Sequence, residues 1–418
     1  MGSKRLTSLV VCLLVGSISA TRVRYDNYNV YKVLPKEAAH LQLLSRLEAH
    51  SDSLKFLTPI IAVGRTVNIL VAPHKQPEFL DILKDNNISY ELAVKNFQKV
   101  LDAEEAERRR SKSSVYDWTG YHTLEETYAW LQSLEEQFPQ YVKVVNAGKS
   151  YEGRDLLGVK VSFKAGNKAV FIEGGIHARE WISPATVTYL LNQILTSKDI
   201  AVRDMAEKHD WYVFPHVNPD GFVYTHTTDR LWRKTRSKGV SCYGADANRN
   251  WDYKWMSVGA SNQECAETYA GKSAFSEIEM KNMAEYIEKE KDNIRLFISF
   301  HSFGQLMLFP YSWTNDPAPN NDDHQRIGDA AAAALVKRYG TVYTVGNSYI
   351  TIYPTSGSSD DWVYGVLNIP LSYTIELRPE DSINGFVLPS AQIIPVGIET
   401  LDGLVAMVNE ADSLGYFE

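Results

Sequence analysis

Two histidines and one glutamate follow predicted strands and have the residue types of a metal site. His177 and Glu180 lie three positions apart, just after the apolar run 169–172, and His301 ends the apolar run 294–300. Ligands collect beyond the carboxyl ends of strands in an open α/β sheet, and a catalytic zinc needs three protein ligands and an open position. A lone histidine at a strand end is more often structural, so the two strand ends together support the hypothesis of a zinc site.

Other catalytic motifs are missing from the sequence. It contains no His-Glu-x-x-His helix and no Gly-x-Ser-x-Gly turn, which argues against thermolysin-type proteases and against serine hydrolases of the α/β-hydrolase type. Gly148-Lys-Ser and Gly271-Lys-Ser imitate the end of a phosphate-binding loop, but the glycine that the motif requires upstream is Lys143 in one and Ala266 in the other.

Two loops, 230–236 and 246–251, concentrate arginines and amides. The planar guanidinium group matches a carboxylate, so the loops would suit a substrate with a free C-terminus. The alternative is a pair of ordinary solvated loops, which the sequence would favour without the histidines.

Several short motifs occur in the order and spacing of one known family. They are His177-Ala-Arg-Glu-Trp181, Asn218-Pro-Asp-Gly221, Arg230-Leu-Trp-Arg-Lys-Thr-Arg236, Asp246-Ala-Asn-Arg-Asn-Trp251, Ile352-Tyr353, Thr374-Ile-Glu376-Leu-Arg378 and Gln392-Ile-Ile-Pro395. With them the chain resembles the secreted zinc metallocarboxypeptidase zymogens of the digestive, pancreatic A/B type, most closely the B type, from its N-terminus to its C-terminus.

The resemblance implies the catalytic roles. His177, Glu180 and His301 would hold one zinc ion per chain, the ligand set known for carboxypeptidase A. Asp246 would hold the other ring nitrogen of His177. Glu376 would be the general base that takes a proton from zinc-bound water as that water attacks the scissile carbonyl, and Arg233 would stabilise the oxyanion.

The resemblance also implies how substrate would be held. Asn248, Arg249 and the hydroxyl of Tyr353 would bind the terminal carboxylate, and Arg179 would help to position the peptide. Phe303 stands where the family usually has tyrosine, and Pro379 follows Arg378 where the family commonly has aspartate. Phe303 removes a hydroxyl near the outer subsites. Neither departure touches a zinc ligand, but both leave the subsite preference open.

Asp360 bears on which C-terminal residue is removed. It falls where A-type enzymes have an apolar residue and B-type enzymes an aspartate, whereas Asp361 is acidic in both branches. A buried carboxylate would be neutralised by a Lys or Arg side chain and left unpaired by an apolar one. We therefore predict a B-type enzyme that releases C-terminal Lys and Arg, with A-type specificity as the alternative, because Ser348 stands where B-type pockets have glycine.

Two further alternatives are a catalytically silent member that binds peptide C-termini and a zinc amidohydrolase for small acylated amino acids. The complete set of ligands, base and oxyanion arginine argues against the first. The long N-terminal segment and the carboxylate-binding cluster argue against the second.

The elements that position these residues divide into two units. Residues 24–94 alternate as strand, helix, strand, strand, helix and strand, which predicts a small ferredoxin-like α+β domain. A charged helix, 96–110, follows and ends in Arg108, Arg109 and Arg110. We predict a propeptide over 21–110 that shields the cleft and is released when a trypsin-like protease cuts within 108–112, although an arginine run is also ordinary at a helix end.

Residues 111–418 are predicted to form the catalytic domain. Apolar runs at 142–145, 156–161, 169–172, 211–214, 294–300 and 371–377 alternate with helices, which predicts an α/β domain around a buried, mixed sheet. Capping boxes are predicted at Thr123 with Glu126 and at Ser276 with Glu279, an N-cap at Ser183, and a helix end at Gly340.

The N-terminus and the cysteines predict a secreted protein. A basic start, a short apolar run and small residues make 1–20 a signal peptide. Cys242 and Cys265 remain after its removal and are predicted to form a disulfide, which is favoured over two free thiols in an oxidising compartment. Asn87-Ile-Ser is a sequon for glycosylation, a weak signal because such triplets are common.

The overall composition limits the partners. The 418 residues carry 43 Lys and Arg against 51 Asp and Glu, a formal net charge of -8, which argues against a nucleic-acid partner. No run after the leader suggests a membrane span. We expect a monomer whose partners are peptide substrates and an activating protease.

Overall fold

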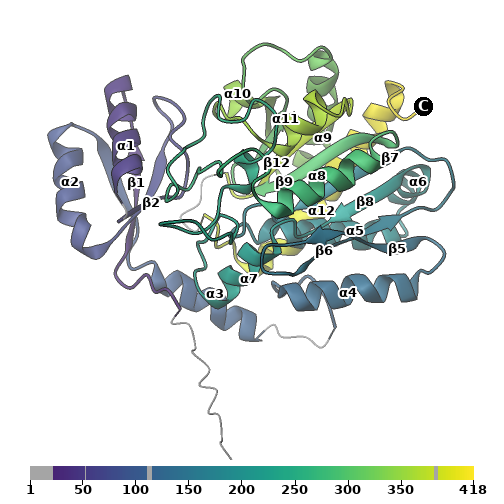
Figure 1. Ribbon diagram of the computed structural model, residues 1–418, viewed down its shortest axis with the longest axis horizontal. Coiled ribbons are helices and arrows are strands. Elements are labelled where there is room, and N and C mark those ends of the chain that lie inside the picture. The colour runs from purple at the N-terminus through teal and green to yellow at the C-terminus, as the bar shows by residue number, and fades with distance from the viewer. Residues whose placement is uncertain (1–21, 52, 111–114, 381–384) are drawn as a thin grey trace, which may run out of the picture.

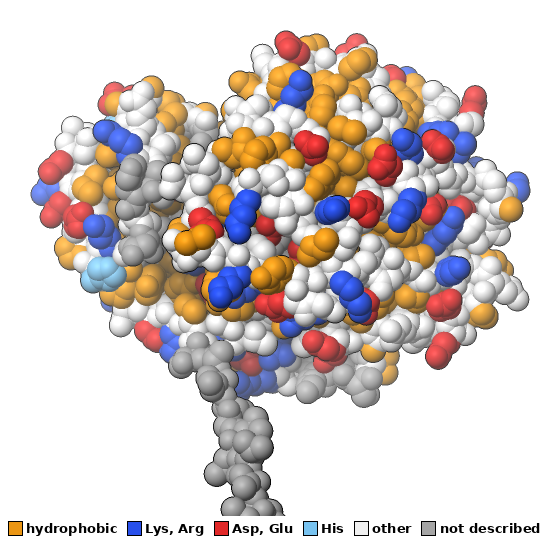
Figure 2. Space-filling model, viewed as in Figure 1, with side chains coloured by type: hydrophobic (Ala, Val, Ile, Leu, Met, Phe, Trp, Pro, Cys, Tyr) orange, Lys and Arg blue, Asp and Glu red, His pale blue; other side chains and the backbone are white. Residues whose placement is uncertain are grey.

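The chain folds into two lobes, each built on its own sheet (Figure 1). The computed structural model describes residues 22–51, 53–110, 115–380 and 385–418. The predicted leader at 1–20 and residues 111 and 112 of the predicted cleavage region lie outside the described residues. Both lobes remain distinguishable on the surface, where acidic and basic side chains are interspersed on the face shown (Figure 2).

The smaller lobe is a four-stranded antiparallel sheet with two helices. Its elements are β1 (Asn29–Leu34), α1 (Ala38–His50), β2 (Leu54–Phe56), β3 (Val67–Val71), η1 (Pro73–Lys75), α2 (Gln76–Asp85) and β4 (Ser89–Val94). The strand order β2-β3-β1-β4 is that of the predicted ferredoxin-like arrangement. Helix α3 (Gln98–Arg110) leads from this lobe to the larger one and ends in the arginine run.

The larger lobe contains an eight-stranded mixed sheet, as predicted. Its elements are α4 (Leu124–Gln137), β5 (Val142–Lys149), β6 (Asp155–Val161), β7 (Ala169–Gly174), α5 (Ile182–Thr196), α6 (Ile200–Lys208), β8 (Asp210–Phe214), α7 (Pro219–Thr227), η2 (Ala247–Arg249), α8 (Ile278–Glu290), β9 (Ile294–Ser302), β10 (Leu306–Phe309), α9 (Asn321–Tyr339), β11 (Thr344–Asn347), α10 (Ser348–Thr351), α11 (Ser359–Gly365), β12 (Leu371–Leu377), η3 (Ser390–Gln392) and α12 (Ile393–Ser413). The strand order is β11-β10-β12-β9-β7-β8-β6-β5, and β12, β9, β7 and β8 run parallel at its centre.

The central strands are apolar throughout because helices cover both faces of the sheet. Val170 and Ile172 of β7 pack into one core with helices α5, α9 and α12. Phe171 points to the opposite core, where its ring stacks on Phe214 and Phe297 with centroids 5.5 and 5.6 Å apart. Parallel strands buried on both sides read as continuous apolar runs, and their carboxyl ends meet at one edge.

Some local predictions fail where tertiary contacts use the same side chains. The capping box at Thr123 and Glu126 forms, and α9 ends at Gly340 with φ 76°. The cap predicted at Ser183 is wrong, because α5 begins at Ile182 and the Ser183 hydroxyl donates to Phe300 O. The box at Ser276 is also wrong, since Glu277 is the N-cap of α8.

Helix α12 is the one described helix long and apolar enough to span a membrane by length and composition. It packs against α9 and α5 within the larger lobe. Glu399 in its middle is fully buried and forms an ion pair with Arg378. Its role in the core accounts for its apolar composition.

The two lobes are joined by one apolar cluster and several polar contacts. Leu57, Phe97 and Leu101 pack in the same buried cluster as Leu231 and Phe386 of the larger lobe. At its margin, Arg230 donates two hydrogen bonds to Glu104 of α3, at 2.7 and 2.9 Å. Asp229 accepts hydrogen bonds from Tyr25 at 2.7 Å and from Lys55 at 3.3 Å.

Candidate active site

His177, Glu180 and His301 meet at the carboxyl end of the central strands. Strand β7 ends at Gly174, and the chain turns at Gly175, whose φ of 66° and close approach to Pro215 O leave no room for a side chain. The turn presents His177 and Glu180 toward His301 of β9. All three side chains are buried, and their candidate ligand atoms lie within 4.8 Å of one another.

The chemistry of these atoms fits a cation. Nδ1 of His177 and Nδ1 of His301 lie 3.1 Å apart, and they lie 2.8 and 3.2 Å from the two oxygens of Glu180. The Nε2 atom of each ring faces a different partner, Asp246 for His177 and Ser299 for His301. If each Nε2 carries the proton, two lone pairs and a carboxylate converge on one point, and a zinc ion in this position would satisfy all three.

Asp246 lies between His177 and Arg233. Its Oδ1 lies 3.1 Å from His177 Nε2, and its Oδ2 accepts from Arg233 Nε and Nη2 at 3.1 and 2.9 Å. Burial opposes ionisation of Asp246, but Arg233, Arg249 and His177 outweigh it and hold the pKa of this carboxyl well below its usual range. Asp246 therefore stays charged and can fix both neighbouring side chains.

Glu376 of β12 pairs in register with His301 of the neighbouring strand β9. Burial, with a further contribution from the charge of Glu180, raises the pKa of Glu376 to about 8, while His301 and Arg233 oppose that rise. A carboxyl group with a pKa near neutrality is suited to exchange protons during a reaction.

Asp360 lines a pocket beside His177, Glu180 and His301, which we call the metal group. His177, Asn248, Arg249, His301, Tyr353, Asp360 and Glu376 all line it, together with Leu308, Ser312, Ser348, Ile352, Thr355, Ser358 and Thr374. Asp360 is only 2% exposed and lies in the first turn of α11. The structure thus brings most of the predicted site residues to one place.

A larger cleft of about 490 Å³ opens above the metal group and is lined by both lobes. The larger lobe contributes Arg179, Arg233 and Glu376 among others, and the smaller lobe contributes residues of α1 and of 56–60. Arg179 lies in this cleft, 2.9 Å from Glu267 and over the ring of Phe386.

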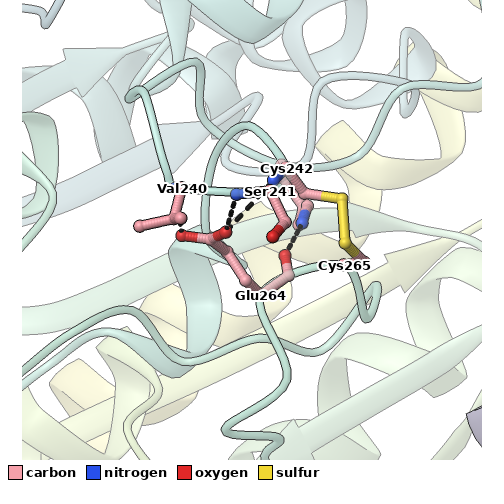
Figure 3. Close-up of a disulfide and its surroundings, with 6 residues drawn as sticks. Val240, Ser241, Cys242, Glu264 and Cys265 are labelled. Atoms are coloured by element: carbon pink, nitrogen blue, oxygen red, sulfur yellow. Dashed lines mark hydrogen bonds between the residues drawn. A yellow bond between two sulfur atoms is a disulfide. The ribbon is translucent and has the colours of Figure 1, made fainter.

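Cys242 and Cys265 form the expected disulfide (Figure 3). Glu264 beside it accepts hydrogen bonds from the backbone N–H groups of Val240, Ser241 and Cys242, which closes the same loop a second time. None of these residues lines the pocket that contains Asp360.

Sequence reasoning missed two groups behind the metal residues, Glu173 and Ser299. Glu173 lies in β7 and is fully buried, and its Oε1 accepts from Ser299. The available signal was an acidic residue directly after the apolar run 169–172, four positions before His177. The smaller lobe's contributions to the cleft were also not predictable residue by residue.

The chain belongs to the zinc carboxypeptidase family. The family model described as "Zinc carboxypeptidase" matches residues 127–403, and the model described as "Carboxypeptidase activation peptide" matches residues 31–104. The protein is thus a zinc carboxypeptidase with an activation peptide, as in the zymogens of this family.

Relatives cover nearly the whole chain. A "Zinc carboxypeptidase A 1" of Anopheles gambiae is 48% identical, with 98% of this chain and 96% of the relative covered. A "Carboxypeptidase B" of the crayfish Astacus astacus is 44% identical, with 70% and 97% covered. Among solved structures, carboxypeptidase A of Helicoverpa armigera has a TM-score of 0.86 at 29% identity, with 93% of this chain and 98% of that chain covered.

Proposed function

We propose that this protein is secreted as a zymogen and, once cut, removes C-terminal Lys and Arg residues from peptides. We propose the same domain boundaries as from the sequence, a leader at 1–20, a propeptide at 21–110 and a catalytic domain at 111–418. The observation that carries the basic specificity is Asp360, a buried carboxylate in the lining of the pocket beside the metal group.

In the proposed mechanism His177, Glu180 and His301 hold zinc, which supplies Lewis acidity for the carbonyl and for water. Glu376 accepts the proton of the attacking water and delivers it to the leaving amine. Arg233, fixed by Asp246, donates hydrogen bonds to the oxyanion as it forms. Arg233 and Glu376 line the same cleft as His177 and Glu180, which supports these proposed roles.

Binding of the terminal carboxylate falls to Asn248, Arg249 and Tyr353. Arg249 is held by hydrogen bonds from its Nε to Gly259 O and from its Nη1 to Asn248 O, which leaves its Nη2 for a ligand. Its guanidinium carbon lies 5.8 Å from the centre of the Tyr353 ring. Arg179, at the edge of the cleft, would contact the peptide further from its end.

The surroundings of Asp360 favour a cationic side chain in the pocket. Burial and the charge of Asp360 raise the pKa of Asp361 well above its ordinary value, and burial, with a smaller contribution from Asp360, raises the pKa of Glu173 to about 7. The neighbouring carboxyl groups therefore take up a proton more readily beside Asp360. A bound ammonium or guanidinium group would pair with the Asp360 carboxylate, whereas an apolar side chain would leave it buried without a counter-charge.

One alternative has its own support. Relatives named carboxypeptidase A match this chain at higher identity than the crayfish enzyme named B does. Ser348 also lines the pocket, where the sequence comparison of the two branches expects glycine in a B-type enzyme, and its hydroxyl donates to Phe309 O at 3.1 Å. A-type specificity for aromatic or aliphatic ends is therefore the second candidate.

The test compares kcat/KM of the trypsin-treated protein on peptides that differ only in the last residue, Arg, Lys, Phe or Leu. We expect Arg and Lys to be preferred, and a preference for Phe or Leu would overturn the assignment. Metal analysis of the purified protein should find one zinc per chain. Full activity after removal of metal by a chelator would refute the proposed mechanism.

A further inference from the structure

Glu173 is a buried carboxylate that the proposed reaction does not use. It is 0% exposed in a strand whose other side chains are apolar, and it faces Ser299 in register across β7 and β9. Its Oε1 accepts two hydrogen bonds, from Ser299 Oγ at 2.9 Å and from Ser359 Oγ at 2.8 Å. A buried carboxyl group is costly without hydrogen-bond partners, and the two serines supply them to Glu173.

The first serine connects Glu173 to a zinc ligand. Ser299 Oγ lies 3.1 Å from His301 Nε2. Because Ser299 donates its only hydroxyl proton to Glu173, its oxygen can only accept from the imidazole. The proton of His301 then resides on Nε2, and Nδ1 keeps its lone pair toward Glu180 and His177. Asp246 fixes His177 directly in the same way.

The second serine connects Glu173 to the pocket. Ser359 is the first residue of α11, and its neighbour is Asp360. Its backbone N–H donates to Asn248 Oδ1 at 2.9 Å, while its hydroxyl donates to Glu173. The start of α11 is thereby held between a proposed carboxylate-binding residue and the strand that leads to His177.

We propose that Glu173 is a positioning residue that orients His301 through Ser299 and anchors the first turn of α11 through Ser359. A single carboxyl group then helps to position one zinc ligand and one wall of the substrate pocket. The inference rests on His301 being a zinc ligand, as in the proposed function.

Two serine variants separate the two branches. Ser299→Ala removes the acceptor of the His301 proton, and we expect zinc affinity, measured on the full-length protein by competition with a chelator, to fall about 10- to 100-fold. Ser359→Ala leaves His301 in place, and we expect zinc affinity within about threefold of wild type and a rise in KM with little change in kcat. KM is measured after trypsin treatment, on whichever C-terminal residue the wild-type enzyme prefers, so the result does not depend on the B-type assignment.

Ser150 provides a matched control. Its hydroxyl donates to a different buried carboxylate, Asp220, at 2.6 Å, and it lines neither the cleft nor the pocket of the site. Ser150→Ala should change neither zinc affinity nor KM. Glu173→Leu, which offers neither serine hydroxyl an acceptor, should weaken zinc binding and raise KM together.

The outcomes are distinguishable. If Ser299→Ala holds zinc as tightly as Ser150→Ala does, Glu173 does not orient His301. If both site serines change zinc affinity and KM to the same extent, the serines support the fold generally and the proposal is wrong. A wild-type protein that binds no zinc would instead refute the proposed function, before any variant is compared.

Discussion

His324 should make the stability of the protein fall as the solution becomes acidic. It is fully buried in α9, where its ring stacks on Phe309 with centroids 5.4 Å apart. Its Nδ1 donates to Asn320 O at 3.1 Å, and its Nε2 accepts from the backbone N–H of Ser372 at 3.3 Å. In the neutral ring, both nitrogens therefore already have a hydrogen-bond partner. A second proton would sit on Nε2 and point at the N–H group of Ser372, which is itself a donor.

The magnitude follows from the pKa. Burial lowers the pKa of His324 from 6.5 to about 4, although Asn320 and Asp323 act in the opposite direction. Between these two values the unfolded chain binds a proton that the folded chain does not, so stability is full above pH 6.5 and is lost as the pH falls. At about 1.4 kcal/mol per pKa unit, the loss between pH 7 and pH 4 is about 3 kcal/mol from this residue.

His324→Gln isolates this contribution. The free energy of unfolding, measured with urea at several pH values from 4 to 8, should depend less on pH in the variant than in the wild type, and the two curves should converge by about 3 kcal/mol on acidification. His74→Gln, which replaces an exposed histidine, is the control. Parallel curves for wild type and His324→Gln, whatever their offset, would refute the reasoning.

Further predictions concern activity and processing. Asp360→Ile should lower kcat/KM for C-terminal Arg at least about 100-fold and raise it for Leu, because a buried ion pair loses one partner; an unchanged ratio would place Asp360 outside the specificity pocket. Glu376→Gln should lower kcat about 10²- to 10⁴-fold with zinc content unchanged, and near-normal turnover would mean that the base lies elsewhere. Trypsin should activate the full-length protein by cutting near Arg108–Arg110, so equal activity before and after treatment would contradict latency. Asn87 is exposed in the turn before β4, so peptide-N-glycosidase should lower the mass of the full-length protein, expressed with its proposed leader, but not of Asn87→Gln.

The sequence predicts the fold correctly where one local pattern of residues determines the structure. The continuous apolar runs of β7 and β9 arise from burial on both faces, and both strands lie where they were predicted. Strands β10 and β11 were not predicted, since each has only four residues and is defined by its pairing with neighbours. The hydroxyls of Ser183 and Ser276 were misassigned as caps because distant groups, Phe300 O and Asn250, use them instead.

The residues of the site can likewise be separated into those that local sequence predicts and those that only the fold brings together. The metal group and Glu376 are local to strand ends, and their convergence follows from the parallel order of β7, β9 and β12. The tie from Glu173 through Ser299 and Ser359 joins three elements far apart in the sequence. Residue types and spacing do not determine which of the many serines in the chain meet one carboxylate, so this link required the fold.

The junction between the lobes affects how activation would proceed. The apolar cluster joins Leu101 to Leu231, and an ion pair joins Glu104 to Arg230, so each contact links a residue before the predicted cut to one after it. Cleavage at the arginine run therefore removes a tether and leaves these contacts intact. While tethered, the smaller lobe has an effective concentration on the order of millimolar; once cut, it competes only at its concentration in solution. Activity should then appear with a lag that shortens on dilution or when a protease digests the freed fragment.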